Sequence, residues 1–204
     1  MSNKIRIKKS ILQYGYLKLE KQEVDIICEN MEKEMRDYFE KNFPSQFKKF
    51  NELKQRQMEE HIQAHIKDEK NQDKINEDKE QPPTESIKDR PKINPDIKKM
   101  YRKIVEYSHP DKIGNNNNSQ VFSDAAEAYK TKNVAKLLDI ASSLNIEFTA
   151  LSKETMSQLE KNISLLNEVI INKKSTTAWQ WHKAEDEETK VNIIMHILNC
   201  EGII

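Results

Sequence analysis

The stretch NPDIKKMYRKIVEYSHPDKIG, residues 94–114, contains the clearest structural pattern in this chain. It opens on Asn94-Pro95-Asp96, in which Asn is a favoured helix N-cap, Pro fits the first helical position and Asp faces the positive end of the helix dipole. Because Pro110 lacks an amide proton and disfavours helix in the residue before it, the helix is predicted to end there. Apolar residues recur between these limits at helical spacing, at Ile97, Met100, Tyr101, Ile104 and Val105.

Two more helices are predicted after a loop. Residues 113–118 read IGNNNN, which is rich in turn formers. A second helix resumes near Ser119, and a short third one follows it. Their apolar positions are Phe122, Ala125, Ala128 and Tyr129 in the former and Val134, Leu137, Leu138, Ala141 and Leu144 in the latter. We therefore expect two antiparallel helices that flank an exposed loop.

The composition favours an all-α protein. The chain has 204 residues, of which 33% are charged, and only 3 glycines. Glu, Lys, Gln, Leu and Met recur without the alternation that is typical of strands. The formal net charge is +0, so no global field attracts nucleic acid or membrane, and electrostatic recognition must come from local clusters.

The sequence divides into four regions. Residues 1–67 are predicted to form an N-terminal helical region, with a first helix from about Lys21 to Lys41 that Pro44 bends or ends, and a long, largely solvated second helix. Residues 68–93 have almost no apolar side chains and contain Pro-Pro, so we interpret them as a charged flexible linker. The loop-flanking helices form a module at 94–148.

The last region, 149–204, is predicted to be a helical hairpin. Ser152 is a plausible N-cap, and the residues after it alternate steps of three and four, as in a coiled-coil seam. The turn KKSTT at 173–177 separates this arm from a terminal apolar stripe, which we expect to be its partner helix. The two sets are Met156, Leu159, Ile163, Leu166 and Ile170, and Val191, Ile194, Ile197 and Leu198.

The 94–148 module resembles a J domain. His109-Pro110-Asp111 matches the family's triplet, the preceding basic segment DIKKMYRKI at 96–104 is similar to the second helix, and Phe122 with Glu127-Ala128-Tyr129 is similar to the third. A triplet alone would be weak, but helix, triplet, loop and helix agree in order and spacing. The close resemblance covers about Asn94 to Ile146.

The resemblance implies a co-chaperone that engages a DnaK-type ATPase and a client protein, with no catalysis and no cofactor of its own. The triplet would contact the ATPase and shift it toward hydrolysis, with Pro110 holding His109 and Asp111 rigid. Cations one turn apart on the preceding helix would face the acidic surface of the ATPase. The predicted partner-binding residues are His109, Pro110, Asp111, Lys98, Lys99, Arg102, Lys103 and Lys112.

The chain departs from the family pattern directly before the triplet, at the first helix, and in the segment that follows the third helix. Ser108 stands where a Tyr is usual, and Lys132 stands where a Leu is usual. The usual first helix has no counterpart in residues 84–95, so we expect another segment to complete the core. The run NVAKLLDIA at 133–141 replaces the terminal basic helix and is similar to a variant ending of divergent bacterial and phage proteins.

The segment AWQW at 178–181 is similar to J-domain proteins predicted in marine bacteriophages. With Cys28 and Cys200 far apart, no leader sequence and no apolar run of the roughly 20 residues that span a bilayer, we expect a soluble protein in a reducing cytoplasm, that of the host if the chain is viral. We expect neither a membrane nor nucleic acid as partner.

Several alternatives stay open. His61 and His65 have helix spacing for a metal but lack a third ligand, so no metal site is predicted. Trp179 and Trp181 are interpreted as core anchors in preference to residues that stack on a client. The competing function is a non-catalytic coiled-coil scaffold or virion-assembly protein with a degenerate J module, and the helical arms are candidates for homodimer contacts. No acid-base or nucleophile cluster indicates an enzyme.

Overall fold

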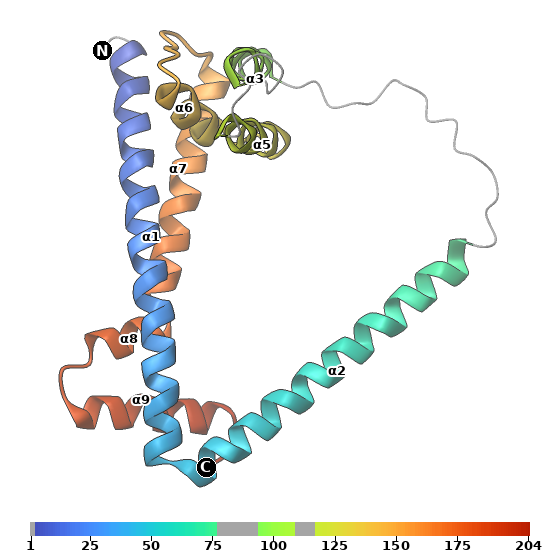
Figure 1. Cartoon of the computed structure of the whole chain (residues 1–204), viewed down its shortest axis with the longest axis vertical. Helices are drawn as coiled ribbons and strands as arrows, with labels where there is room; N and C mark the ends of the chain where they lie inside the picture. Colours follow the sequence, from blue (N-terminus) through green and yellow to red (C-terminus); the bar gives the residue numbers. More distant parts are fainter. Residues whose placement is uncertain (1–2, 77–93, 109–116) are drawn as a thin grey trace. The chain divides into compact units, whose positions relative to one another are not determined.

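The computed structural model describes residues 3–76, 94–108 and 117–204, with the backbone alone at 65–76 and 117–118. The described residues are helical and include no strand, which confirms the all-α class. The helices, drawn in Figure 1, are α1 (Asn3–Asn42), α2 (Pro44–Asn76), α3 (Pro95–Ser108), α5 (Asn117–Lys130), α6 (Val134–Ser143), α7 (Lys153–Lys174), α8 (Thr177–Lys183) and α9 (Glu187–Cys200).

The chain divides into two compact units that share the long helix α1. Unit 1 comprises residues 1–26 and 91–175, and unit 2 comprises residues 27–90 and 176–204. This division corrects the four predicted regions, because neither 1–67 nor 149–204 forms a unit of its own. The module at 94–148 lies within unit 1 together with the first half of α1 and all of α7.

In unit 1 the first half of α1 runs beside α7 and meets α6 (Figure 1). Its buried side chains recur at steps of three and four and include Ile7, Tyr14 and Leu17. Ion pairs join its exposed flanks to the rest of the unit, at Lys4–Glu147, Arg6–Glu160, Lys18–Asp139, Lys174–Glu20 and Lys173–Asp25. The segment that completes the core of the module is therefore α1, far from it in sequence.

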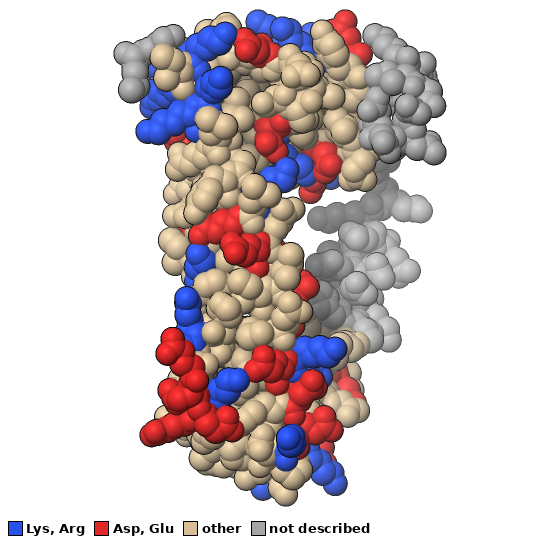
Figure 2. All heavy atoms as spheres, turned by 60° about the vertical axis from the view of Figure 1, so that its left-hand side comes forward, with Lys and Arg blue, Asp and Glu red and all other residues tan. Residues whose placement is uncertain are grey.

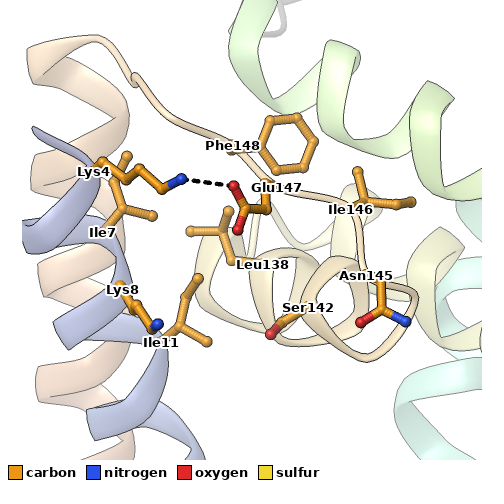
Figure 3. A pocket seen from close by; sticks show the side chains of 10 residues that line it. All are labelled: Lys4, Ile7, Lys8, Ile11, Leu138, Ser142, Asn145, Ile146, Glu147 and Phe148. Carbon is orange, nitrogen blue, oxygen red and sulfur yellow. Dashed lines mark hydrogen bonds and ion pairs between the residues drawn. The ribbon is translucent and has the colours of Figure 1, made fainter.

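The N-terminal turns of α1 line a recess of about 410 Å³ together with α6 and the non-helical segment that follows α6. Figure 3 shows Ile7 and Ile11 on the α1 side and Leu138 of α6 across from them, with the Lys4–Glu147 ion pair, 2.8 Å long, at the edge. Phe148 lies at the same recess and also contacts α3, as described below. The recess thus marks where α1 meets the module.

In unit 2 the second half of α1 packs with α2, α8 and α9 around aromatic rings. Phe39 is buried against Phe47 and Phe50, whose ring centroids lie 5.2 and 5.7 Å from its own. Trp181 is also buried, and its Nε1–H donates to Glu34 at 3.2 Å. The core residues are Phe39, Trp181, Ile193, Ile194 and Leu198.

Two predicted boundaries are corrected, and a third is confirmed. Helix α1 begins at Asn3 rather than near Lys21 because its buried face continues to Ile7. Helix α2 runs to Asn76, into the region predicted as a linker from residue 68, and residues 77–93 of that region lie outside the described residues. The break at Phe43, between α1 and α2, lies where Pro44 predicted it.

The predicted C-terminal hairpin is also corrected. Helix α7 packs in unit 1 with α6 and α1, whereas α9 packs in unit 2 with the aromatic core. Both apolar stripes exist as predicted, with Leu159 and Ile163 buried in α7 and Ile194 and Leu198 buried in α9. The two stripes have different partners because the first half of α1 belongs to the unit of α7 and the second half to the unit of α9.

Candidate partner-binding surface

Helix α3 begins at the predicted N-cap. The Asn94 side-chain oxygen accepts from the Asp96 backbone N–H at 2.9 Å. The Asp96 carboxylate then reaches the start of α7, where it accepts from the Ser152 N–H at 2.8 Å and from the Thr155 hydroxyl at 2.8 Å. Thr155 is fully buried, so this network fixes the start of α3 against the start of α7.

The pKa of Asp96 reflects this network. Burial acts to raise the pKa of the carboxyl, but the hydrogen bonds from Ser152 and Thr155 and the nearby Lys99 charge favour the ionised form. The net result is a pKa below the ordinary value of an aspartate. Asp96 is therefore a structural anion at a helix N-terminus, where the helix dipole also favours it.

Helices α3 and α5 pack side by side, and α6 contacts both. Met100 and Ile104 of α3 and Ala125 and Ala128 of α5 are fully buried, and the small alanines allow a close approach. Two tyrosine rings, of Tyr101 in α3 and Tyr129 in α5, stack with centroids 4.5 Å apart and an interplanar angle of 19°. The predicted pairing of these two helices is confirmed.

The triplet lies in the segment that joins this helix pair. His109, Pro110, Asp111 and Lys112 fall outside the described residues. Helix α3 ends at Ser108, directly before them, as Pro110 predicted, and α5 begins at Asn117. The chain connectivity therefore attaches the triplet to the end of a helix whose start is anchored on α7.

Three of the four predicted cations of α3 point to solvent. Lys98, Lys99 and Arg102 are exposed, on the side of the helix opposite Met100 and Ile104. Within the described residues none of the three forms an ion pair. They form a basic face one turn long on the helix that precedes the triplet in the sequence.

Lys103 differs from its neighbours. It is only half-exposed, and its Nζ lies 5.4 Å from the centroid of the Phe148 ring, a cation–π contact. Glu106, which the sequence reasoning did not single out, is exposed one turn beyond Arg102. The four-residue step from Arg102 to Glu106 places both side chains on the same side of the helix, and this spacing could have identified Glu106 from the sequence. The basic face therefore comprises Lys98, Lys99 and Arg102, bounded by an acidic residue.

Two departures from the family pattern have structural explanations. Ser108 is fully buried, and its hydroxyl donates to the Ile104 carbonyl at 2.9 Å, so a small polar residue closes the end of α3. Lys132 adopts a left-handed backbone conformation, with φ of 54°, in the turn between α5 and α6. The Asn133 N–H then donates to the Ala128 carbonyl at 2.8 Å, so this position makes a helix-ending turn.

The tryptophans follow the prediction only in part. Trp181 is 1% exposed and anchors unit 2, whereas Trp179 is half-exposed beside His182, with ring centroids 5.3 Å apart. Both lie on α8, a helix that was not predicted from the sequence. Its signal was Thr176, whose side chain caps α8 by accepting from the Trp179 N–H.

Neither metal chemistry nor a membrane span is indicated in the part of the chain that the structure describes. No group of three or more His, Cys, Asp or Glu side chains there is placed to hold an ion. The side chain of His65, considered with His61 as a ligand pair, is outside the described residues. Among the described helices none combines the length and the apolar run needed to cross a bilayer.

Comparison of the chain with protein families, with curated proteins and with solved structures finds no match in any of the three.

Proposed function

We propose that this chain is a J-domain co-chaperone that binds a DnaK-type chaperone and stimulates its ATPase. The proposal starts from His109-Pro110-Asp111 and the flanking segments that resemble the second and third helices of J domains. The observation that carries it is the packing of α3 on α5, because these are the two helices that the triplet connects. The chemistry is allosteric: binding energy shifts the ATPase toward hydrolysis, and no bond is made or broken here.

The electrostatics of α3 support an acidic partner. Lys98, Lys99 and Arg102 are exposed on the helix that precedes the triplet in the sequence, and they have no ion pair within the described residues. Complementary charges of this kind mainly raise the association rate and set the orientation of the complex. Because exposed charges are screened over about 10 Å at 0.1 M salt, the complex should be weak and salt-sensitive.

The rigid attachment of helix α3 also supports the proposal. A contact segment binds more tightly when less of its conformational freedom remains to be lost. Helix α3 is held at its start by Asp96 on Ser152 and Thr155, and along its length by the stacked Tyr101 and Tyr129. The helix end to which the triplet is attached thus belongs to a packed unit.

The proposal is tested by the ATP hydrolysis rate of a DnaK-type chaperone in the presence of the full chain. We expect the native chain to stimulate ATP hydrolysis and the His109→Gln variant to leave the hydrolysis rate at its basal value. His182→Gln is the matched control, since His182 is an exposed histidine of unit 2. This control should stimulate as well as the native chain.

The competing scaffold function predicts a different result from the same assay. If native, His109→Gln and His182→Gln chains all leave hydrolysis at its basal rate, the module is inactive and the co-chaperone proposal is overturned. Circular dichroism of each variant establishes that the helices are intact, so a negative result is not a folding failure. If the native chain does stimulate hydrolysis, the next step is to identify its client protein.

A further inference from the structure

The first half of α1 carries a second apolar face that no described residue of unit 1 covers. Its residues are 58–67% exposed, although all are large and apolar. Isolated exposed apolar side chains are ordinary, but a contiguous row on one helix face is typical of an interaction site. The row is Ile5, Leu12, Tyr16, Leu19 and Ile26.

This row follows a heptad pattern. Ile5, Leu12, Leu19 and Ile26 are each seven residues apart, and Tyr16 lies at the intervening position of the middle heptad. These four residues supply one of the two positions of a coiled-coil heptad over three heptads, and Tyr16 supplies the other position in the middle heptad. The opposite face of α1 is already used inside the unit, where Ile7, Ser10, Tyr14, Leu17 and Val24 are buried. Helix α1 therefore has one satisfied seam and one open seam.

The two charged residues of the open seam indicate which partner fits it. Lys9 and Glu23 are exposed, and each lies seven residues from Tyr16, on opposite sides of it. In a parallel pair of α1 helices, Lys9 would face Lys9 and Glu23 would face Glu23. In an antiparallel pair centred on Tyr16, each Lys9 faces a Glu23 of the other copy, and the apolar residues also come together.

We propose that the open seam is the interface of an antiparallel homodimer, formed by α1 with α1 of a second copy about a two-fold axis near Tyr16. A two-fold interface is self-complementary, which the placement of Lys9 and Glu23 satisfies twice. This inference does not depend on the co-chaperone proposal. Figure 2 shows basic side chains gathered where α1 begins and a largely uncharged surface further along that side of unit 1.

Gly15 supports the same arrangement. A glycine inside a helix costs conformational entropy, so it usually has a packing reason. A Cβ added at Gly15 would meet no atom within 4 Å, so no contact with the described residues requires a glycine there. Next to Tyr16, at the centre of the proposed interface, the missing side chain leaves room for the second helix.

The dimer is tested first by sedimentation of the full chain over a series of concentrations. We expect a reversible dimer for the native chain and a monomer for the double variant Leu12→Lys/Leu19→Lys. The matched control is Leu165→Lys/Val169→Lys, which makes the same change at exposed positions of α7 in the same unit. This control should dimerise like the native chain. A native chain that stays monomeric, or a dimer that the Leu12 and Leu19 changes leave intact, overturns the proposal.

Charge exchange then tests the orientation. Lys9→Glu and Glu23→Lys should each weaken the dimer, raising its dissociation constant by about tenfold or more, because each places like charges together twice. The double variant Lys9→Glu/Glu23→Lys should restore native affinity. If the single variants dimerise as well as the native chain, or the double variant fails to recover while its circular dichroism is native, the antiparallel pairing is wrong.

Discussion

Asp96 accepts a hydrogen bond from the backbone N–H of Ser152 at 2.8 Å, and this bond links the first turn of α3 to the N-cap of α7. Replacing Asp96 with Ala removes that bond and the bond from the buried Thr155 hydroxyl. We expect a loss of about 1.5–3 kcal/mol in the free energy of unfolding, the range for hydrogen bonds to charged groups. Urea unfolding followed by circular dichroism measures it.

The control for this loss is Asp37→Ala, which removes an exposed aspartate from α1. Surface changes of this kind usually alter the free energy of unfolding by less than about 0.5 kcal/mol. Equal stabilities of the Asp96→Ala and Asp37→Ala variants would show that the network between α3 and α7 contributes nothing to the fold.

The same carboxylate predicts a pH dependence. The pKa of Asp96 is lower in the folded chain than its ordinary value, so ionised Asp96 stabilises the fold at every pH above its unfolded pKa of about 3.9. That contribution is lost as the pH falls through the folded pKa. In urea titrations, the stability difference between native chain and Asp96→Asn should be constant above about pH 5 and shrink below about pH 4. A difference that does not vary with pH would contradict this account.

Trp181 is predicted to be the main anchor of unit 2. It is 1% exposed, its ring meets Tyr38 edge-on at 5.1 Å, and Lys190 lies 5.0 Å over its face. Trp181→Ala should therefore destabilise unit 2 by about 3–5 kcal/mol, the range for large aromatic truncations in a core. Thermal unfolding monitored by circular dichroism measures the change. Trp179→Ala, at a half-exposed position of the same helix, should cost clearly less.

The basic face of α3 is predicted to govern the rate of complex formation. Lys98→Glu/Arg102→Glu should lower the association rate constant with the DnaK-type chaperone by about tenfold or more while leaving the fold intact. Stopped-flow binding at 0.05 and 1 M salt provides the measurement, because the effect should fade as the screening length shortens to about 3 Å. Lys153→Glu/Lys161→Glu reverses two exposed lysines of α7 and is the control for net charge.

The sequence predicted the elements whose signals are local. Asn94 and Ser152 are the N-caps that their residue types indicated, and Pro44 and Pro110 mark helix ends. A cap depends on one side chain and the next few backbone amides, so it is readable from a short stretch.

What the sequence did not predict depends on contacts between distant residues. The start of α1 was missed because Ile7, Tyr14 and Leu17 look irregular until α6 and α7 cover them. The terminal stripe was paired with α7 because the two are neighbours in sequence, although its partner is Phe39 and the aromatic residues around it. Periodicity shows that a helix has an apolar face and leaves open which surface covers that face.

The candidate site was predictable to a similar degree. The exposure of Lys98, Lys99 and Arg102 follows from their spacing against the buried Met100. The contact of Lys103 with Phe148 does not, since it joins residues that are far apart in sequence.

The central claim is most directly tested by single-turnover ATP hydrolysis on a DnaK-type chaperone titrated with the full chain. The account predicts that the rate rises to a plateau with the native chain and with the control Asp37→Asn, and that Asp111→Asn gives no rise at any concentration. Equal curves for native chain and Asp111→Asn, whether stimulated or flat, would contradict it.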